Sequence, residues 1–341
     1  MTRSIYHDII IVGSDVAGLL AGSLLSRRKY RVLHVAQGHL GVSYRDHGME
    51  LIGAPQLLPP YGHAPVLDNL LKEIGIEDPV HVLGSQDCPP LQVITPEQRI
   101  DIFSDDSCLK SELARTFPEQ KDATLELINR LRTVDEQFKE LLSGFPALPP
   151  DGIREKAKAK RDLASLEQLQ LSKPSSWTPL MKILAAATGF ISNFNLERNP
   201  VFVTGHHVLA LLGGLRSVPD FKKLLIRATT KAGSDVEEKF VAEEIIIERK
   251  NATGIRTLRS SQTYNCQSVI TSLAVNQAVE LVPLSQRHKR FLATANSVRP
   301  DQSLFVVNLV VPNEIVPLGM GKQLVLVRRM NEPLTEDNLI K

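Results

Sequence analysis

The segment that most constrains the fold is an apolar strand followed by a glycine turn, a helix and a second strand. Residues 8–12 form a β-branched run, which is typical of a strand buried on both faces of a parallel sheet. The turn spans residues 13–18, the helix is predicted over residues 19–25, and the second strand over residues 30–35. This length of about thirty residues matches a βαβ unit, so the sequence predicts an α/β domain with a parallel sheet.

The turn matches a dinucleotide-binding motif at two of its three glycines. In that motif the first glycine makes a tight turn, the second lets the backbone approach a pyrophosphate, and the third lets helix and strand pack closely. Gly13 and Gly18 hold the first and third positions, whereas Asp15 holds the second. The other members of this candidate cofactor-binding loop are Ser14, Val16 and Ala17.

Asp15 has two interpretations. A carboxylate about 4 Å from a phosphate charge costs roughly 1 kcal/mol in water and about 4 kcal/mol at an effective dielectric constant of 20. Aspartate is also a favoured helix N-cap, which stabilises a helix by roughly 0.5–2 kcal/mol. In the second case the chain supplies its own anion and the phosphate site is closed. A flavin still binds if Asp15 turns outward or is bridged by water or a cation.

The acidic residue that holds the ribose in such a domain is expected at the end of the second strand, about 20 residues after the turn. That position is Ala36, which has no carboxylate. Ala36 therefore marks the candidate ribose position without its usual ligand.

The order of the later segments resembles the phytoene desaturase and amine oxidase branch of the FAD-dependent oxidoreductases. Residues 40–43 correspond to a Leu-Gly-Gly-Arg segment of that branch, with Gly41 retained, Val42 at the second glycine and Ser43 at the arginine. The resemblance covers residues 5–285. Its other segments are residues 47–53, 69–76, 212–215, 218–231, 240–248, 254–258 and 268–271.

The resemblance implies a fold, a cofactor and a reaction. It implies a Rossmann-like parallel sheet domain that binds FAD, over residues 1–90 and 206–285, with an inserted α+β cap domain for the substrate over residues 91–205 and 286–341. It implies a backbone contact to adenine near Val241. The implied reaction is hydride removal from a small, apolar or amine-type substrate, in which the flavin carries the chemistry.

Two functions remain open. The first is that of an FAD-dependent oxidoreductase, supported by the order of the segments and by Gly13 and Gly18. The alternative is a non-catalytic binding or structural subunit that keeps the fold without the flavin. The family continues beyond this length into a glycine-rich closing segment, which residues 331–341 do not resemble. Either the chain is a fragment, or a partner chain supplies that segment. A related fold serves the proteins that extract prenylated small GTPases from membranes without redox chemistry.

The cap domain is predicted to be mainly helical. A hairpin is expected over residues 91–103, and strands over residues 303–311 and 323–329. Trp177 is expected to pack in its core. Helices are predicted over residues 107–115, 121–142 and 155–171, the last with a basic run at 156–161 that is typical of a solvated helix face.

Charge, cysteines and histidines indicate which partners, metal sites and compartment the sequence favours. The net charge is +2, from 40 basic and 38 acidic residues, which does not favour nucleic acid as a partner. The three cysteines form no C-x-x-C pair, which excludes a zinc site made of cysteines. The few cysteines and the lack of a targeting or membrane-spanning segment both favour the cytoplasm. Peripheral membrane contact stays open. His206 and His207 are adjacent, a poor geometry for a joint metal site without distant ligands, so no metal is predicted.

Overall fold

The chain forms two compact units, each with its own sheet. Unit 1 comprises Met1–Gln56, Leu70–Pro79 and Ser217–Leu309, and unit 2 comprises Leu57–Asn69, Val80–Arg216 and Val310–Lys341. The computed structural model describes residues 6–37, 43–52, 57–58, 63–77, 91–144, 150, 152–167, 171–188, 200–214, 216–258, 263–298, 307–321, 323–330, 332 and 339–340.

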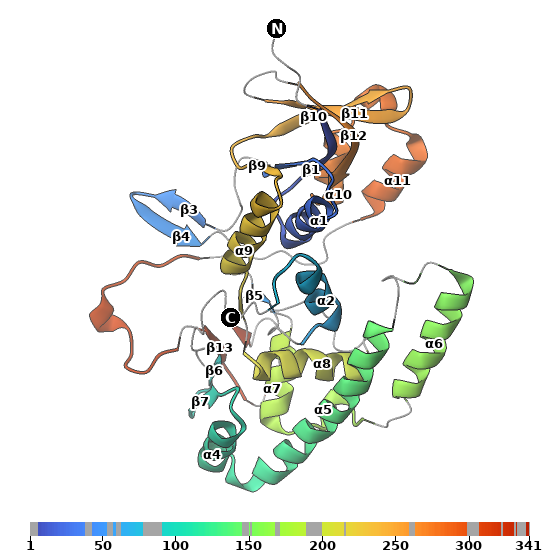
Figure 1. Ribbon diagram of the computed structural model, residues 1–341. Coiled ribbons are helices and arrows are strands. Elements are labelled where there is room, and N and C mark those ends of the chain that lie inside the picture. The colour runs from blue at the N-terminus through green and yellow to red at the C-terminus, as the bar shows by residue number, and fades with distance from the viewer. Residues whose placement is uncertain are drawn as a thin grey trace. The chain divides into compact units, whose positions relative to one another are not determined.

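The sheet of unit 1 is Rossmann-like. Its order is β10-β11-β12-β1-β2-β9, in which β12, β1, β2 and β9 run parallel, and β10 and β11 extend it as antiparallel strands (Figure 1). The strands are β1 (Tyr6–Val12), β2 (Val32–Val35), β9 (Asp235–Glu237), β10 (Ala242–Glu248), β11 (Asn251–Thr257) and β12 (Thr263–Thr271). The predicted strand–helix–strand unit and parallel sheet are therefore confirmed.

Helices α1 (Val16–Arg27) and α9 (Val218–Lys231) lie side by side in unit 1 (Figure 1). The hydroxyl of Ser23 lies 2.8 Å from that of Thr229 and donates to the carbonyl of Leu225 at 3.1 Å. Small polar residues thus allow the two helices to approach closely while their buried hydroxyls remain hydrogen-bonded. Unit 1 also contains the short helices α10 (Val275–Glu280), η4 (Leu284–Gln286) and α11 (Lys289–Ser297).

A hairpin follows the first βαβ unit. Strands β3 (Ser43–Asp46) and β4 (Met49–Ile52) pair antiparallel, and the positive φ angles of His47 and Gly48 form the turn between them. Strand β4 lies within residues 47–53, one of the segments that the resemblance covers. The remaining short elements are α2 (Pro65–Glu73) and the paired strands β5 (Leu57–Leu58) and β8 (Arg216–Ser217).

Unit 2 has a four-stranded sheet with the order β14-β13-β6-β7. Strands β6 (Leu91–Ile94) and β7 (Arg99–Ile102) form the predicted hairpin, and the hydroxyl of Thr95 accepts from the backbone N–H of Gln98 in its turn. Strand β13 (Gln323–Val327) pairs parallel with β6, and β14 (Leu339–Ile340) pairs antiparallel with β13. The predicted strand at 323–329 is thus confirmed over residues 323–327.

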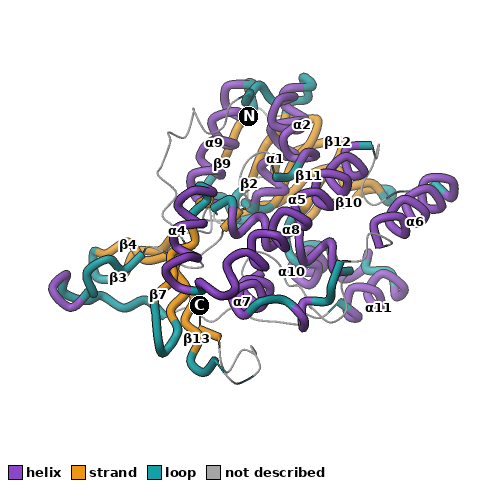
Figure 2. Tube along the Cα trace, turned by 90° about the horizontal axis from the view of Figure 1, so that it is seen from below, coloured by secondary structure: helices purple, strands orange, loops and turns teal. Residues whose placement is uncertain are grey.

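Helices make up most of unit 2, as predicted. Gly205 of α8 packs against Leu131 of α5, where a Cβ would lie 2.7 Å from Leu131 Cδ2, and Figure 2 shows these helices side by side. Trp177 is buried in the core, and its indole N–H donates to the carbonyl of Ser172 at 2.8 Å. The helices are α4 (Asp106–Thr116), η1 (Pro118–Gln120), α5 (Lys121–Ser143), α6 (Ile153–Glu167), η2 (Pro174–Ser176), α7 (Pro179–Ala187) and α8 (Val201–Leu212).

The boundaries of the compact units differ from those expected. The expected return to the nucleotide-type domain at residue 206 falls inside α8, a continuous helix whose apolar side belongs to the core of unit 2. Unit 2 accordingly extends to Arg216, and residues 286–309 belong to unit 1 instead of to the cap.

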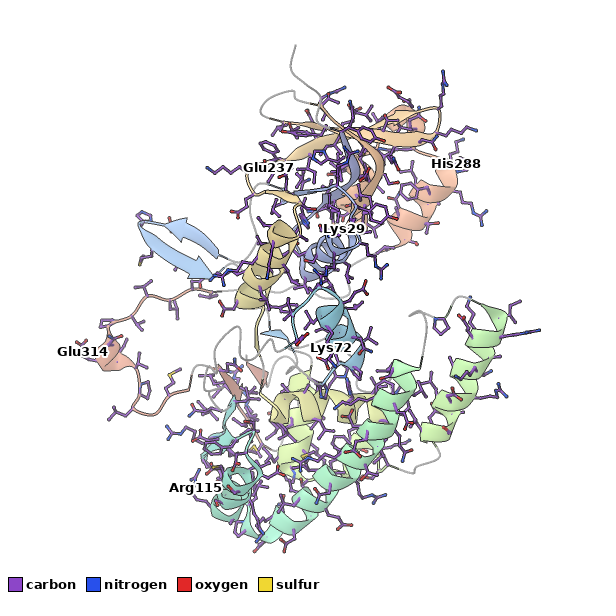
Figure 3. The ribbon with its side chains drawn as sticks, in the orientation of Figure 1. Lys29, Lys72, Arg115, Glu237, His288 and Glu314 are labelled. Carbon is purple, nitrogen blue, oxygen red and sulfur yellow. The ribbon has the colours of Figure 1, made fainter. Side chains whose placement is uncertain are left out.

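The strand predicted at 303–311 is wrong over residues 307–311. Residues 307–312 form neither a helix nor a strand, and η5 (Asn313–Ile315) follows them. Apolar side chains are exposed there, with Leu309 at 79% and Leu318 at 98%, and Figure 3 labels Glu314 on this segment. β-Branched residues favour a strand only where a neighbouring edge is available to pair with. Residues 303–306 lie outside the described residues.

The basic run on α6 and the absence of a membrane-spanning segment are both expected from the sequence. The basic residues of the 156–161 run are exposed on α6, which confirms the solvated helix face. Among the helices that the structure describes, none is both long and apolar enough to cross a membrane.

Candidate functional site

The glycine loop of unit 1 lies at the carboxyl end of β1 and leads into α1. Gly13 has a φ of 124°, a conformation that disfavours a side chain. Its N–H donates to the carbonyl of Val35 at 2.9 Å, and its carbonyl accepts from His34 Nε2 at 2.5 Å. His34 and Val35 both lie on β2, so this neighbouring strand fixes the first turn of the loop.

Ser272 occupies the space that the two glycines leave free. A Cβ on Gly18 would lie 2.5 Å from Ser272 Oγ, and a Cβ on Gly13 would meet the same oxygen. Ser272 directly follows β12, and its N–H donates to the carbonyl of Val12 at 3.0 Å. The absence of side chains at Gly13 and Gly18 is therefore already required by packing within the chain.

Asp15 is the N-cap of α1. Its Oδ1 accepts a hydrogen bond from the backbone N–H of Gly18 at 2.7 Å, which confirms the capping interpretation. In a dinucleotide-binding loop the free N–H groups of this helix end face the phosphates. One of these N–H groups is here bonded to the protein's own carboxylate.

A buried cation compensates the charge of Asp15. Lys222 of α9 is 4% exposed and interacts electrostatically with Asp15. Burial lowers the pKa of Lys222, because it disfavours the charged amine, and the negative charge of Asp15 opposes that shift. The loop therefore carries a carboxylate, and the neighbouring helix α9 carries a buried lysine that interacts with it.

The end of β2 offers no acidic side chain. Val35 and Ala36 are both buried, and the N–H of Ala36 donates to the backbone carbonyl of Glu237 at 3.1 Å. The side chain of Glu237 supplies a carboxylate on the adjacent strand β9, opposite Val35 (Figure 3). The predicted ribose position is thus apolar and closed by a neighbouring strand.

The side-chain amide of Gln37 forms hydrogen bonds with the backbone of Ala242, the residue after the predicted adenine contact at Val241. Gln37 has a positive φ of 55°, and its amide binds the backbone of Ala242 twice. Gln37 Oε1 accepts from the N–H of Ala242 at 2.6 Å, and Nε2 donates to its carbonyl at 3.3 Å. The carbonyl of Val241 accepts from the N–H of Leu258 at 3.0 Å. Gly41 and Val42 lie outside the described residues.

A second polar cluster lies in unit 2. His63 precedes α2, Asp135 lies on α5 and His206 lies on α8. His206 Nδ1 is 2.5 Å from Asp135 Oδ1, and the ring of His63 stacks on that of His206 with centroids 4.0 Å apart. Lys139, one helical turn after Asp135, places its Nζ 2.8 Å from Asp135 Oδ2.

Burial controls the protonation of this cluster. It lowers the pKa of His63 to about 3, with additional repulsion from His206 and Lys139. Burial raises the pKa of Asp135, but the hydrogen bonds with His206 and Lys139 outweigh it and hold the pKa below its usual value. His63 is therefore neutral and Asp135 ionised at neutral pH.

A pocket of about 280 Å³ adjoins the cluster. His63, Asp135 and Lys139 line it, together with an ion pair in which Arg132 donates two hydrogen bonds to Asp106. The sequence reveals no such site, because His63, Asp135 and His206 are far apart along the chain. The only local signal is the Asp135–Lys139 spacing of four residues, which is common on helix surfaces.

Comparisons with known proteins concern the fold. The family model of an NAD(P)-binding Rossmann-like domain matches residues 11–74. The first βαβ unit is Rossmann-like. A search of curated proteins finds no match to the sequence.

Several solved structures are similar to this chain. A Pyrococcus furiosus protein is 17% identical, with 87% of this chain and 66% of that one covered and a TM-score of 0.47. An oxidoreductase from Methanosarcina mazei is 15% identical, with coverages of 87% and 66% and a TM-score of 0.47. Putrescine oxidase is 14% identical, with coverages of 86% and 63% and a TM-score of 0.46. The chain spans slightly less than two thirds of the length of each.

Proposed function

We propose that this chain is a flavin-oxidoreductase-like protein that acts as a binding subunit instead of a flavin enzyme. The observation that carries this proposal is the hydrogen bond from the Gly18 N–H to Asp15. It places a carboxylate where the pyrophosphate of FAD would approach the helix end, and like charges at such a distance repel each other by roughly 1–4 kcal/mol.

The other contacts expected for FAD support the same conclusion. Ala36 supplies no carboxylate to the ribose, and the amide of Gln37 already binds the backbone next to Val241. Ser272 fills the space beside both glycines. The residues present in unit 1 therefore do not fit FAD.

A second candidate function is FAD-dependent hydride removal of the desaturase or amine oxidase type. It is favoured by the Rossmann-like match over residues 11–74 and by the buried Lys222 beside Asp15. If Asp15 rotated away from the helix end, Lys222 and the Gly18 N–H would both be able to interact with a phosphate.

Titration with FAD distinguishes the two functions. We expect weak binding to the natural chain, and binding at least about tenfold tighter to the double variant Asp15→Gly with Ala36→Glu, since about 1.4 kcal/mol corresponds to a tenfold change. Asp15→Ala is the matched control, because it removes the charge but leaves a Cβ. If the double variant binds no more tightly than the natural chain, these two positions are not what prevents binding.

A binding subunit requires a partner, and we propose a protein chain that binds through an apolar surface. The exposed apolar side chains of residues 307–320, among them Leu309 and Leu318, support an interacting surface. Pull-down from the native source followed by size measurement should give a heteromer. A stable monomer of uniform size would contradict the proposal.

A further inference from the structure

We propose that His63, Asp135 and His206 form a binding site in unit 2 for a divalent transition-metal ion of the zinc class. Each residue offers one ligand atom, and these atoms all lie within 4.8 Å of one another. Two imidazoles with one carboxylate are a ligand set used by catalytic zinc sites and by related first-row metal sites. The site lies outside the glycine loop and goes beyond the proposed function.

The distances between the ligand atoms would have to change only slightly for a zinc ion to bind. Bonds of about 2.0–2.2 Å to zinc place tetrahedral ligand atoms roughly 3.4 Å apart. The 2.5 Å contact between His206 Nδ1 and Asp135 Oδ1 would have to lengthen by about 1 Å. His206 would lose its Nδ1 proton to become a ligand, as metal-binding histidines do.

His63 is the strongest indication of a ligand. Its side chain is 6% exposed, and its Nε2 has no hydrogen-bond partner among the described residues. A buried polar atom without a partner is destabilising by about 1–3 kcal/mol. A neutral imidazole nitrogen is also the form that binds metals. An ion bound to His206 and Asp135 would give this nitrogen the partner that it lacks.

Lys139 supplies the positive charge beside Asp135 that a bound metal ion would otherwise supply. Its ammonium lies 2.8 Å from Asp135 Oδ2 and neutralises the buried carboxylate. The side chain is 26% exposed, so the ammonium is able to move into solvent when an ion arrives. Lys139 therefore competes with the metal, and its removal should tighten binding instead of weakening it. A purely structural ion-pair cluster predicts no such gain.

The adjoining pocket leaves room for an exchangeable ligand. His63 and Asp135 both line it, so the ion would face a space of about 280 Å³. Sites with three protein ligands keep an open position for water or substrate, whereas closed structural sites use four. Arg132 is paired with Asp106 at the same pocket and adds no net charge to it.

The experiment is metal titration of the full chain. After chelation and buffer exchange, Zn²⁺ is titrated against a competing chromogenic chelator, and Co²⁺ absorption reports the coordination geometry. We expect one saturable site per chain and a low-symmetry Co²⁺ spectrum. Binding should weaken at least about tenfold in His63→Gln and His206→Ala. It should be unchanged in the control His207→Gln and tighter in Lys139→Met.

His63→Gln keeps the test decisive, because it removes the ring that stacks on His206 but breaks neither the His206 nor the Lys139 contact of Asp135. Its thermal midpoint should stay close to that of the natural chain. Equal metal binding by His63→Gln and His207→Gln would overturn the proposal and indicate adventitious binding at surface groups. Weaker binding by Lys139→Met would also overturn it, because the lysine would then support the site instead of competing for it.

Discussion

The carboxylate of Asp15 accepts a hydrogen bond of 2.7 Å from the N–H of Gly18, across a loop whose sequence pattern belongs to phosphate binding. The chain thereby satisfies the end of α1 with its own anion. Lys222 balances that charge from α9. The loop keeps the turn of a dinucleotide-binding motif while its central position serves the stability of the helix.

Replacing Asp15 tests the capping role separately from ligand binding. Asp15→Ala should destabilise the protein by about 1 kcal/mol, whereas Asp15→Gly should cost only a few tenths, because glycine is itself tolerated as an N-cap. Both variants leave the buried Lys222 without its counter-charge, so the difference between them reports the cap. Urea unfolding measures both values. Equal and negligible losses would show that the hydrogen bond to Gly18 contributes little.

Gly18→Ala tests the packing against Ser272. The added Cβ would lie 2.5 Å from Ser272 Oγ, so we expect a loss of about 1–3 kcal/mol in the free energy of unfolding. The double variant with Ser272→Ala should recover much of this loss, because it removes the oxygen that clashes. A double-mutant cycle gives the coupling.

The matched control for Gly18→Ala is Gly152→Ala. A Cβ there meets its nearest atom at 3.8 Å, and Gly152 has no positive φ. It should therefore have little effect. A coupling energy near zero between Gly18→Ala and Ser272→Ala would contradict the close contact.

His34 should make the protein less stable in acid. It is fully buried, and burial lowers its pKa from 6.5, against the hydrogen bond to Gly13 and the charge of Asp15. The unfolded chain therefore binds more protons below about pH 6.5 than the folded chain does, so stability falls as the pH falls through this range. One such group contributes at most about 1.4 kcal/mol per pH unit.

The variant His34→Gln isolates this contribution. Glutamine is able to donate to the carbonyl of Gly13 but does not titrate. Free energies of unfolding measured from about pH 7 to pH 5 should fall less steeply for the variant than for the natural chain. Parallel curves would contradict the lowered pKa, because they would show that His34 titrates alike in the folded and unfolded states. His7, His63 and His207 also have lowered pKa values, so the variant should keep a residual slope.

Trp177 gives a probe of unit 2 alone. It is the single tryptophan of the chain, lies in the core of unit 2 and is 3% exposed. Its emission should therefore be blue-shifted, resist quenching by acrylamide and shift to the red when unit 2 unfolds. Trp177→Ala should cost about 3–5 kcal/mol. Strong quenching in the native protein would contradict its burial.

The sequence predicted the elements whose patterns are local. The strand–turn–helix over residues 8–25 and the hairpin over residues 91–103 follow from local patterns, and each is found, the hairpin over residues 91–102. Capping is one of the two interpretations that the sequence offers for Asp15, because that role depends on residues three positions apart, and it is the one found. The strand expected at 307–311 failed because pairing depends on an edge that composition does not reveal.

The polar groups that matter most are brought together by tertiary structure. Ser272 meets Gly13 and Gly18 only because β12 pairs with β1. His63 and Asp135 reach His206 only because three separate segments of unit 2 pack together. The adjacent histidines 206 and 207 suggested no metal site, since the missing ligands lie far away in the sequence.

The flavin content of the purified chain tests the central claim most directly. The chain is purified under native conditions, incubated with excess FAD, freed of unbound ligand and denatured, and the released flavin is measured by fluorescence and mass. A loop closed by Asp15 predicts no retained flavin. Near-stoichiometric FAD would contradict it, because the carboxylate at the end of α1 would then be compatible with a bound pyrophosphate.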